Sequence, residues 1–371
     1  MNNYLIKDLI SEISMGPFGS NIKVECFVDD GIPVLNGSNL EGFSLKEESF
    51  RYVTEQKADS LGKANAHRGD VVITHRGTLG QIVFIPQNSK FDRYVISQSQ
   101  FRVKCNEKVL PEYLVYYFHT KLGQHKLLSN ASQVGVPALA RASTTFQMID
   151  IDIPSVDIQK KIVDVLETIR EKIELNNKIN NNLEQQMLSM FQSSFSDLYN
   201  SKQSTFESII QFSNGKKRPN EIGNIPVYGG NGILAYTNKS NAENCIIIGR
   251  VGAYCGNVFL SSSCCWVSDN AIQAKSKISD CQLFTYFALK GANLPSRHIG
   301  TGQPLMTQGI LNSIPFGEPN IADVKLFEDK CLPLQQAIEN NIAENTVLLG
   351  AMDALLPKLM SGELDLSEID I

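Results

Sequence analysis

The stretch GDVVITHRGTLGQIVF, residues 69–84, has a counterpart later in the chain, ENCIIIGRVGAYCGNVF, residues 243–259. Each copy has an apolar run rich in β-branched residues, a turn with glycines and one arginine (Arg76 or Arg250), and a second apolar run ending in Val-Phe. This pattern predicts two strands joined by a tight turn. Because it occurs twice, it indicates a duplicated module.

The correspondence continues on both sides of this stretch in the same order. The further pairs are YVISQSQF (94–101) with WVSDNAIQ (266–273), SQVGVPAL (132–139) with GTGQPLM (300–306), and the Ile-Pro at 153–154 with the Ile-Pro at 314–315. The segment that leads up to each Ile-Pro is rich in β-branched residues and turn signals, so we expect mainly strands and loops in both segments.

A long helix is expected shortly after each Ile-Pro. Apolar residues recur every three or four positions in 155–195 and again in 320–364, which is the period of a helix with one buried face. The expected buried stripes are Ile158, Ile162, Leu166, Ile169, Ile173, Ile179, Leu183, Met187 and Met190 in the first helix, and Ile338, Ile342, Leu348, Leu349, Met352, Leu355 and Leu356 in the second. About forty residues would reach roughly 60 Å, so each helix needs a partner, and the obvious arrangement is an antiparallel pair.

Some residues interrupt these stripes. Asn176, Asn177 and Asn180 form a polar gap in the first helix, where buried polar residues cost stability but can fix register. In the second helix we expect Pro333 to interrupt the first part and Pro357 to bend or break the end. Gly362 is a plausible stop signal.

These patterns predict an α+β fold. It has two similar mainly-β modules separated by two long antiparallel coiled-coil helices, in a pseudo-two-fold tandem repeat. The expected segments are module 1 (1–154), a central spacer helix (155–199), module 2 (200–317), and a distal spacer helix with a C-terminal tail (318–371).

Charge is distributed unevenly over these four segments. The 371-residue chain has a net charge of −5, but the segments carry 0, −2, +5 and −8 in chain order. An acidic final segment therefore masks a basic module 2, and the whole-chain charge does not exclude nucleic acid as a partner.

Several classes of function find no support in the sequence. The eight cysteines show no C-x-x-C and the five histidines no metal-binding spacing, so we expect reduced thiols and no metal site. No nucleotide-binding loop, nucleophile elbow or N-P-P-[YF] methyltransferase motif occurs. The chain has no apolar run of about 18 residues, and its first residues lack a signal-peptide pattern, so we expect a cytoplasmic protein without a membrane partner.

The duplicated turns are the best candidates for a ligand site. An arginine beside glycines presents a planar fork of donors suited to guanine or phosphate, and Asn or Gln can pair with adenine. For a single copy, a solvated arginine on an ordinary hairpin is the simpler interpretation, and the amides could equally stabilise turns. Two copies at equivalent places favour a ligand. The candidate DNA-binding residues are Ser20, Asn21, Lys23, Asn36, Ser38, Asn39, His75, Arg76, Thr78, Gln98, Gln100, Gln133, Arg141, Lys216, Lys217, Arg218, Tyr228, Asn231, Arg250, Tyr254, Asp269, Asn270, Thr301 and Gln303.

The ordered set of motifs resembles the DNA specificity (S) subunit of type I restriction–modification systems. The motifs that carry the resemblance are GPFGSNIK (16–23), GIPVLNGSNL (31–40), IPVYGGNGI (225–233), IIIGRVGAYCGNVF (246–259), WVSDNA (266–271) and ALLPKLMSGELDL (354–366). The resemblance covers essentially the whole chain. One departure is that the second helix lacks the entry pattern that IPSVDIQKKI (153–162) shows in the first half.

The resemblance implies a non-catalytic, DNA-binding subunit of a host-defence system in the prokaryotic cytoplasm. Each module would be a target-recognition domain that reads one half of a split double-stranded DNA target. The helices would act as a coiled-coil spacer and dock two methyltransferase (modification) subunits, which carry S-adenosylmethionine and methylate adenine. A separate restriction subunit would use ATP and Mg, and this chain would bind no cofactor.

The resemblance also suggests roles for the loop SMGPFGSNIK (14–23). Gly16, Pro17 and Gly19 would shape a turn, Phe18 would pack, and the polar residues would face DNA. The alternative from a different class is a non-DNA adaptor, with two β-rich modules that bind protein or peptide on a coiled coil. A self-contained methyltransferase is a weaker third reading.

Overall fold

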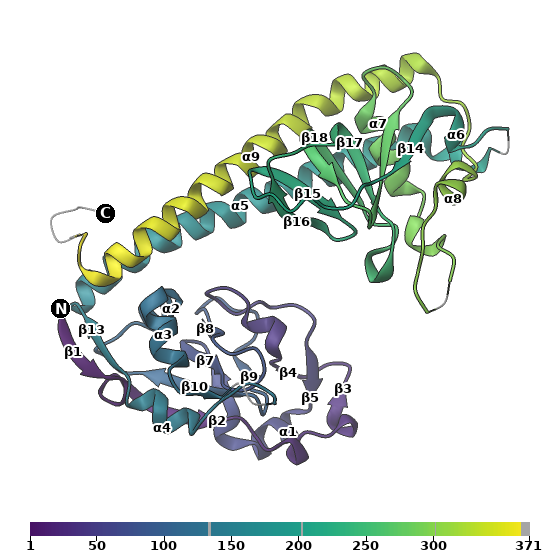
Figure 1. Ribbon diagram of the computed structural model, residues 1–371. Coiled ribbons are helices and arrows are strands. Elements are labelled where there is room, and N and C mark those ends of the chain that lie inside the picture. The colour runs from purple at the N-terminus through teal and green to yellow at the C-terminus, as the bar shows by residue number, and fades with distance from the viewer. Residues whose placement is uncertain (133–134, 202, 301, 365–371) are drawn as a thin grey trace. The chain divides into compact units, whose positions relative to one another are not determined.

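The computed structural model describes residues 1–132, 135–201, 203–300 and 302–364, with only the backbone described at Ser20. It forms two compact units (Figure 1). Unit 1 comprises Met1–Ile173 and Thr346–Ile371, and unit 2 comprises Glu174–Asn345. Each unit contains one strand-rich module and a part of both long helices. The two predicted spacer segments are thus shared between the units.

Module 1 contains thirteen strands and four α-helices in the described residues. They are β1 (Asn2–Leu5), β2 (Ile10–Met15), β3 (Phe27–Val28), β4 (Ile32–Val34), β5 (Arg51–Val53), α1 (Glu55–Ser60), β6 (Asn65–His67), β7 (Asp70–Thr74), β8 (Ile82–Phe84), β9 (Arg93–Val95), β10 (Gln100–Cys105), α2 (Pro111–His119), α3 (Lys121–Leu128), β11 (Ala131–Ser132), β12 (Ala138–Leu139), α4 (Ala142–Gln147) and β13 (Asp150–Ile153).

Module 2 has fewer elements, with six strands and three α-helices in the described residues. They are α6 (Phe206–Ile209), β14 (Ile210–Asn214), β15 (Ile225–Gly229), β16 (Gly232–Thr237), β17 (Ala242–Gly249), β18 (Val258–Val267), β19 (Ala271–Ser276), α7 (Gln282–Gly291) and α8 (Gln308–Asn312). The long helices are α5 (Val156–Phe195) and α9 (Ile321–Ser361).

Each module has its own sheet, and the two sheets have the same strand order over four strands. In module 1 the strands lie in the order β2-β10-β7-β8, and in module 2 four strands lie in the equivalent order β14-β19-β17-β18. Each module also has one parallel strand pair. In module 2 β15 extends the same sheet, with Val227 paired to Trp266 of β18, whereas in module 1 the pair of Val34 in β4 with Val95 in β9 belongs to a separate five-stranded sheet. A buried helix follows the sheet in both, α2 in module 1 and α7 in module 2. The predicted duplication is therefore confirmed at the level of strand order.

The helix α9 is continuous where the sequence predicted an interruption. It runs through Pro333 and Pro357. Both prolines are exposed, while Cys331, Leu356 and Leu359 beside them are buried against their unit. A proline removes one backbone hydrogen bond, and we attribute the unbroken helix to the packing of the neighbouring turns. The helix ends at the predicted stop, where Gly362 has φ +75° and its N–H donates to Leu359 O.

Figure 1 shows α5 and α9 running side by side in unit 2. They pair antiparallel there, and side-chain amides join them. Asn176 donates to Asn345 Oδ1 at 2.9 Å, and Asn341 donates to Asn180 Oδ1 at 2.8 Å, so residue numbers rise along one helix as they fall along the other. Asn176 is fully buried, whereas Ile179 is exposed. The expected stripe is wrong at Ile179 and Ile342, which are exposed because amides occupy this part of the seam, and it is also wrong at Leu349, which is exposed in unit 1.

Each long helix is joined to its module by one buried polar side chain near its N-terminus, Gln159 in the first turn of α5 and Glu328 two turns into α9. Gln159 accepts a hydrogen bond from Leu110 N at 2.9 Å, at the start of α2. In the second half, which lacks the entry motif, Glu328 accepts from Leu283 N at 2.9 Å and Phe284 N at 3.0 Å, at the start of α7. A carboxylate in a different sequence context thus takes the place of the amide.

Candidate nucleic-acid interface

A cluster of loops in module 1 is built around Gly16, at the end of β2. Its N–H donates to Gln100 O at 2.8 Å, and a Cβ at this position would lie 1.8 Å from Ser97 O. Only glycine permits this approach. The loop after β2 is therefore held directly against the turn between β9 and β10.

The turn after β7 joins the same cluster through its backbone. His75 N donates to Ser99 O at 2.8 Å, Leu139 N donates to His75 O at 2.9 Å, and Gly77 N donates to Pro137 O at 2.9 Å. We call the loops 16–21, 75–80, 97–100 and 135–139 loop cluster 1. Segments far apart in the sequence are thus brought together by main-chain contacts.

Module 2 repeats these contacts at equivalent positions. Gly215 N donates to Ala271 O at 3.1 Å, and a Cβ there would lie 1.9 Å from Ser268 O. Arg250 N donates to Asn270 O at 3.0 Å, and Met306 N donates to Arg250 O at 2.8 Å. The loops 215–218, 250–256, 268–270 and 302–306 form loop cluster 2.

The equivalence corrects the register expected from the sequence. Matching the arginines had placed Arg76 opposite Arg250, but the backbone contacts place His75 opposite Arg250. Arg76 bridges to Ala138, and its true counterpart Val251 bridges to Leu305. Main-chain bonds set the register of the two modules. The two arginines of the sequence motif are therefore one position out of register and are not structural equivalents.

Three of the loops of loop cluster 1 line a hollow of about 620 Å³ together with the segment 60–64. Its rim includes Phe18, Lys63, His75, Arg76 and Gln98. Burial lowers the pKa of His75, and the nearby Arg76 lowers it further, against the raising effect of the Gln98 carbonyl. The lowered pKa favours the neutral imidazole, whose Nε2 lies 3.1 Å from Gln98 O.

The other candidate residues of this cluster differ in exposure and in whether they form an ion pair. Asn21, Thr78 and Gln98 are exposed. Lys23 is exposed too, but its Nζ lies 3.7 Å from Glu25 Oε1. The expectation that Phe18 packs is wrong, since it is 83% exposed.

Loop cluster 2 is more strongly cationic. Lys216, Lys217 and Arg218 are all exposed. Arg250 is only half-buried, yet its Nε is buried without a hydrogen-bond acceptor, and its Nη1 makes one long contact, 3.4 Å, to Asp269 O. The guanidinium therefore has donors to offer to a ligand.

Further candidates lie beside loop cluster 2. Asp269, Asn270, Tyr254 and Gln303 are exposed on its loops. Asn231 is exposed next to Gly230, where a Cβ would lie 3.7 Å from Val251 O. The cluster thus offers anionic, amide and phenolic groups next to its cations.

Four candidates of module 1 serve turns instead. Asn39 is buried and its amide donates to Lys46 O and Glu48 O, at 2.9 and 2.8 Å. Gln100 is buried and accepts from Ser97 N at 2.9 Å. Asn36 accepts from both the N–H and the hydroxyl of Ser38. The buried pair Asn39 and Gln100 cannot face a ligand in this structure, so the prediction is wrong for them.

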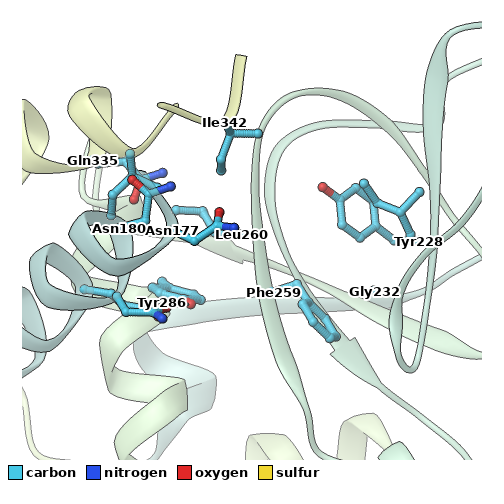
Figure 2. A pocket seen from close by; sticks show the side chains of 13 residues that line it. Asn177, Asn180, Tyr228, Gly232, Phe259, Leu260, Tyr286, Gln335 and Ile342 are labelled. Atoms are coloured by element: carbon cyan, nitrogen blue, oxygen red, sulfur yellow. Dashed lines mark hydrogen bonds between the residues drawn. The ribbon is translucent and has the colours of Figure 1, made fainter. Parts of the chain in front are cut away.

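Tyr228 lies at a different hollow, of about 700 Å³ in unit 2. Figure 2 shows Tyr228 and Phe259 of the sheet there, with Asn177 and Asn180 of α5 and Ile342 of α9. Burial raises the pKa of Tyr228. Its ring lines this hollow, so we remove it from the DNA-facing set.

The remaining candidates are placed as follows. Arg141 is exposed in the left-handed region, with φ +48°, just before α4. The side chain of Ser20, Gln133 and Thr301 lie outside the described residues. Sequence reasoning missed Lys63, which lines the hollow of loop cluster 1 but belongs to no recognisable motif.

Within the described residues, no group of three or more His, Cys, Asp or Glu side chains could hold a metal ion. Among the described residues, no helix contains an apolar stretch long enough to cross a membrane. The chemistry that both clusters offer is hydrogen bonding and positive charge on rigid loops.

Two equivalent loop-bearing modules that alternate with long helices define a tandem recognition protein. A model of the type I restriction modification DNA specificity domain matches residues 21–185 and 202–339, so it matches each module in turn. The chain belongs to this family of type I restriction–modification specificity subunits.

Two relatives illustrate the range of the family. The specificity subunit of the type I restriction enzyme HindI from Haemophilus influenzae is 31% identical over 141 residues, which are 35% of this chain and 28% of that protein. The chain thus matches less than a third of this curated relative's length. The crystal structure of a type I S subunit from M. genitalium has the same fold, with a TM-score of 0.58 and 16% identity over 97% of this chain and 96% of that one.

Proposed function

We propose that the chain reads a bipartite double-stranded DNA target, with one half-site bound by each loop cluster. The observation that carries this proposal is the backbone equivalence of the two clusters, which presents different side chains from the same scaffold. His75 in one cluster and Arg250 in the other occupy the equivalent position. Two loop clusters with the same backbone structure and different exposed side chains suit a DNA target whose two halves differ in sequence.

Within each half-site, phosphate contacts position the module and base contacts select the sequence. The cations Lys216, Lys217 and Arg218, in the +5 segment, suit phosphates. Arg250 suits guanine, because the two terminal nitrogens of a guanidinium can bond O6 and N7 together. Gln98 and Asn270 are exposed amides at the turn of each cluster and suit adenine.

The long helices would hold the readers apart and dock two methyltransferase subunits. Exposed apolar residues on these helices support a protein partner, among them Leu175 of α5 and Val347 and Leu349 of α9. The charge of −8 over residues 318–371 disfavours contact with DNA. S-adenosylmethionine would be held by the methyltransferase, and ATP and Mg by a restriction subunit. This chain would bind no cofactor, perform no catalysis and work in the prokaryotic cytoplasm.

Single-molecule methylation mapping tests this function. A host that carries this chain and its methyltransferase should show one bipartite methylated motif. Arg250→Ala should relax or lose one half of the motif, and His75→Ala the other half.

Two lysines provide matched controls. Lys104 and Lys275 are exposed near the far ends of the equivalent strands β10 and β19. Lys104→Ala and Lys275→Ala should leave the motif unchanged. A variant that weakens binding equally at all sequences and lowers its salt dependence would mark that residue as a phosphate contact. If Arg250→Ala altered both halves alike, one reader per half-site would be refuted.

A further inference from the structure

Phe18 stands out among the exposed apolar residues because of how it is held. It lies two residues after Gly16, whose N–H bonds Gln100 O and whose Cα is pressed against Ser97 O. On its other side, Phe18 O accepts a hydrogen bond from Asn21 N at 2.8 Å. The ring is therefore presented on a short turn fixed at both ends, although it is 83% exposed.

The surroundings of Phe18 suit a polyanion. The ring lies at the rim of the hollow that Lys63, His75 and Arg76 also line. Neither Lys63 nor Arg76 forms an ion pair within the described part of the chain. A single exposed apolar residue needs no explanation by itself. Phe18 differs from such a residue because its backbone is fixed and its ring lies beside unpaired cations and loops proposed to read bases. Its exposure therefore indicates a binding role.

Module 2 carries a cation at the equivalent position. Counting two residues from Gly215, the counterpart of Gly16, gives Lys217, which is exposed. The scaffold is thus the same, but one module presents an aromatic ring and the other an ammonium group. The two groups suit different parts of DNA, since a ring prefers base faces and an ammonium group prefers phosphates.

We propose that Phe18 is an apolar wedge that enters a base step of the half-site bound by module 1, while Lys217 contacts a phosphate in the half-site bound by module 2. The proposal rests on the DNA-reading function proposed above and assigns a role to each equivalent residue. The wedge partly unstacks one base step, and the cations around the hollow hold the flanking backbone. Steps that unstack easily, such as TA or CA, are preferred where Phe18 enters.

Fluorescence of 2-aminopurine tests the wedge directly, because this base brightens when it is unstacked. The assembled complex with the methyltransferase is titrated onto duplexes that carry 2-aminopurine at successive positions of the mapped target. We expect brightening at one step of the half-site bound by module 1, and its loss in Phe18→Ala. Phe18→Trp should restore it, since a larger ring can enter the same step.

Affinity and its salt dependence separate the two roles. Phe18→Ala should weaken binding about 5- to 150-fold, the range for losing one aromatic–base stacking contact, without changing the slope of log K against log salt. Lys217→Ala should reduce that slope by about 0.9, the value for one lost phosphate contact. Val24, 81% exposed in the same module but away from the hollow, gives the matched control Val24→Ala, which should change neither quantity.

Each outcome decides a separate point. Unchanged affinity and unchanged 2-aminopurine signals in Phe18→Ala overturn the wedge while DNA reading stands. A loss of complex assembly in Phe18→Ala, with DNA binding normal in what assembles, overturns it in favour of a protein contact. If the wild-type complex neither binds nor methylates a bipartite target, the proposed function itself fails. Thermal unfolding of Phe18→Ala should match wild type, because so exposed a ring contributes little to the core.

Discussion

The replacement of Asn176 by alanine tests whether the buried amides between α5 and α9 act as a coupled pair. Asn176 is fully buried and donates to Asn345 Oδ1 at 2.9 Å and to Glu344 Oε2 at 2.8 Å. The bond to the buried Asn345 is worth about 0.5–1.5 kcal/mol, and the bond to the charged Glu344 about 1.5 kcal/mol because water can replace it at that exposed carboxylate. The buried Oδ1 of Asn176 has no partner, so its removal returns about 1 kcal/mol.

With about 1 kcal/mol for the cavity, Asn176→Ala should lower the free energy of unfolding of unit 2 by about 2–3 kcal/mol. Asn345→Ala breaks the same bond from the other side, and it also removes the 3.0 Å bond that Asn345 donates to Asn177 Oδ1, so it should cost about 1–3 kcal/mol. Since the shared bond can be lost only once, the double variant should be less destabilised than the sum of the single variants by about 1 kcal/mol.

Urea unfolding of the full chain measures this coupling. Trp266, the chain's one tryptophan, lies in unit 2, so its fluorescence reports the unfolding of that unit. Asn180 and Asn341 form the matched control, because their 2.8 Å bond is only partly buried and water can replace it. A coupling energy for the Asn176–Asn345 pair no larger than that of the control pair would refute the reasoning.

Three further predictions follow from the same contacts. Gly16→Ala should weaken reading of the module 1 half-site by about 5- to 150-fold, because the new Cβ would lie 1.8 Å from a backbone oxygen and loop cluster 1 must shift. Gly37→Ala, whose Cβ meets only a flexible side chain at 3.7 Å, is the control in the same methylation and binding assays. Burial raises the pKa of Glu328, so its neutral form is favoured in the fold; stability is present below the ordinary carboxyl value and is lost as pH rises through the raised pKa. The loss should be smaller in Glu328→Gln, measured by urea unfolding across that pH range, and an identical pH dependence would contradict the assignment. Insertion of two helical turns in both α5 and α9 should lengthen the gap between methylated half-sites and leave the half-sites themselves unchanged, and mapping that shows the same gap would contradict a spacer role.

The long helices and the order of the strands could be predicted from the sequence because both depend on periodicity. A stripe every three or four residues identifies α5 almost to its ends, and paired apolar runs identify β7 and β17 with the strands that follow them. The prolines of α9 could not be judged, because their cost depends on whether they face solvent. Whether a proline faces solvent depends on how the helix packs against the rest of its unit, which the sequence pattern does not show.

The candidate site was predicted less completely, for a physical reason. Asn39 and Asn270 are the same residue type, but the first is buried in a turn and the second is exposed on a loop cluster. Asparagine and glutamine satisfy either role with the same hydrogen bonds, so residue type alone cannot separate turn formation from base reading. Burial separates them, and burial is decided by contacts that are distant in the sequence.

The division of labour between backbone and side chains explains how two loop clusters with different side chains share one scaffold. The contacts that build both clusters are main-chain bonds at Gly16 and Gly215, and at His75 and Arg250. A main-chain bond does not depend on the side chain attached to it, so a change from imidazole to guanidinium leaves the bond in place. The glycines are the exception, because a Cβ would block the approach of two strands. Recognition residues on these loops can therefore change without loss of the fold, while the glycines cannot, and a reader exchanged between modules should keep its own half-site preference.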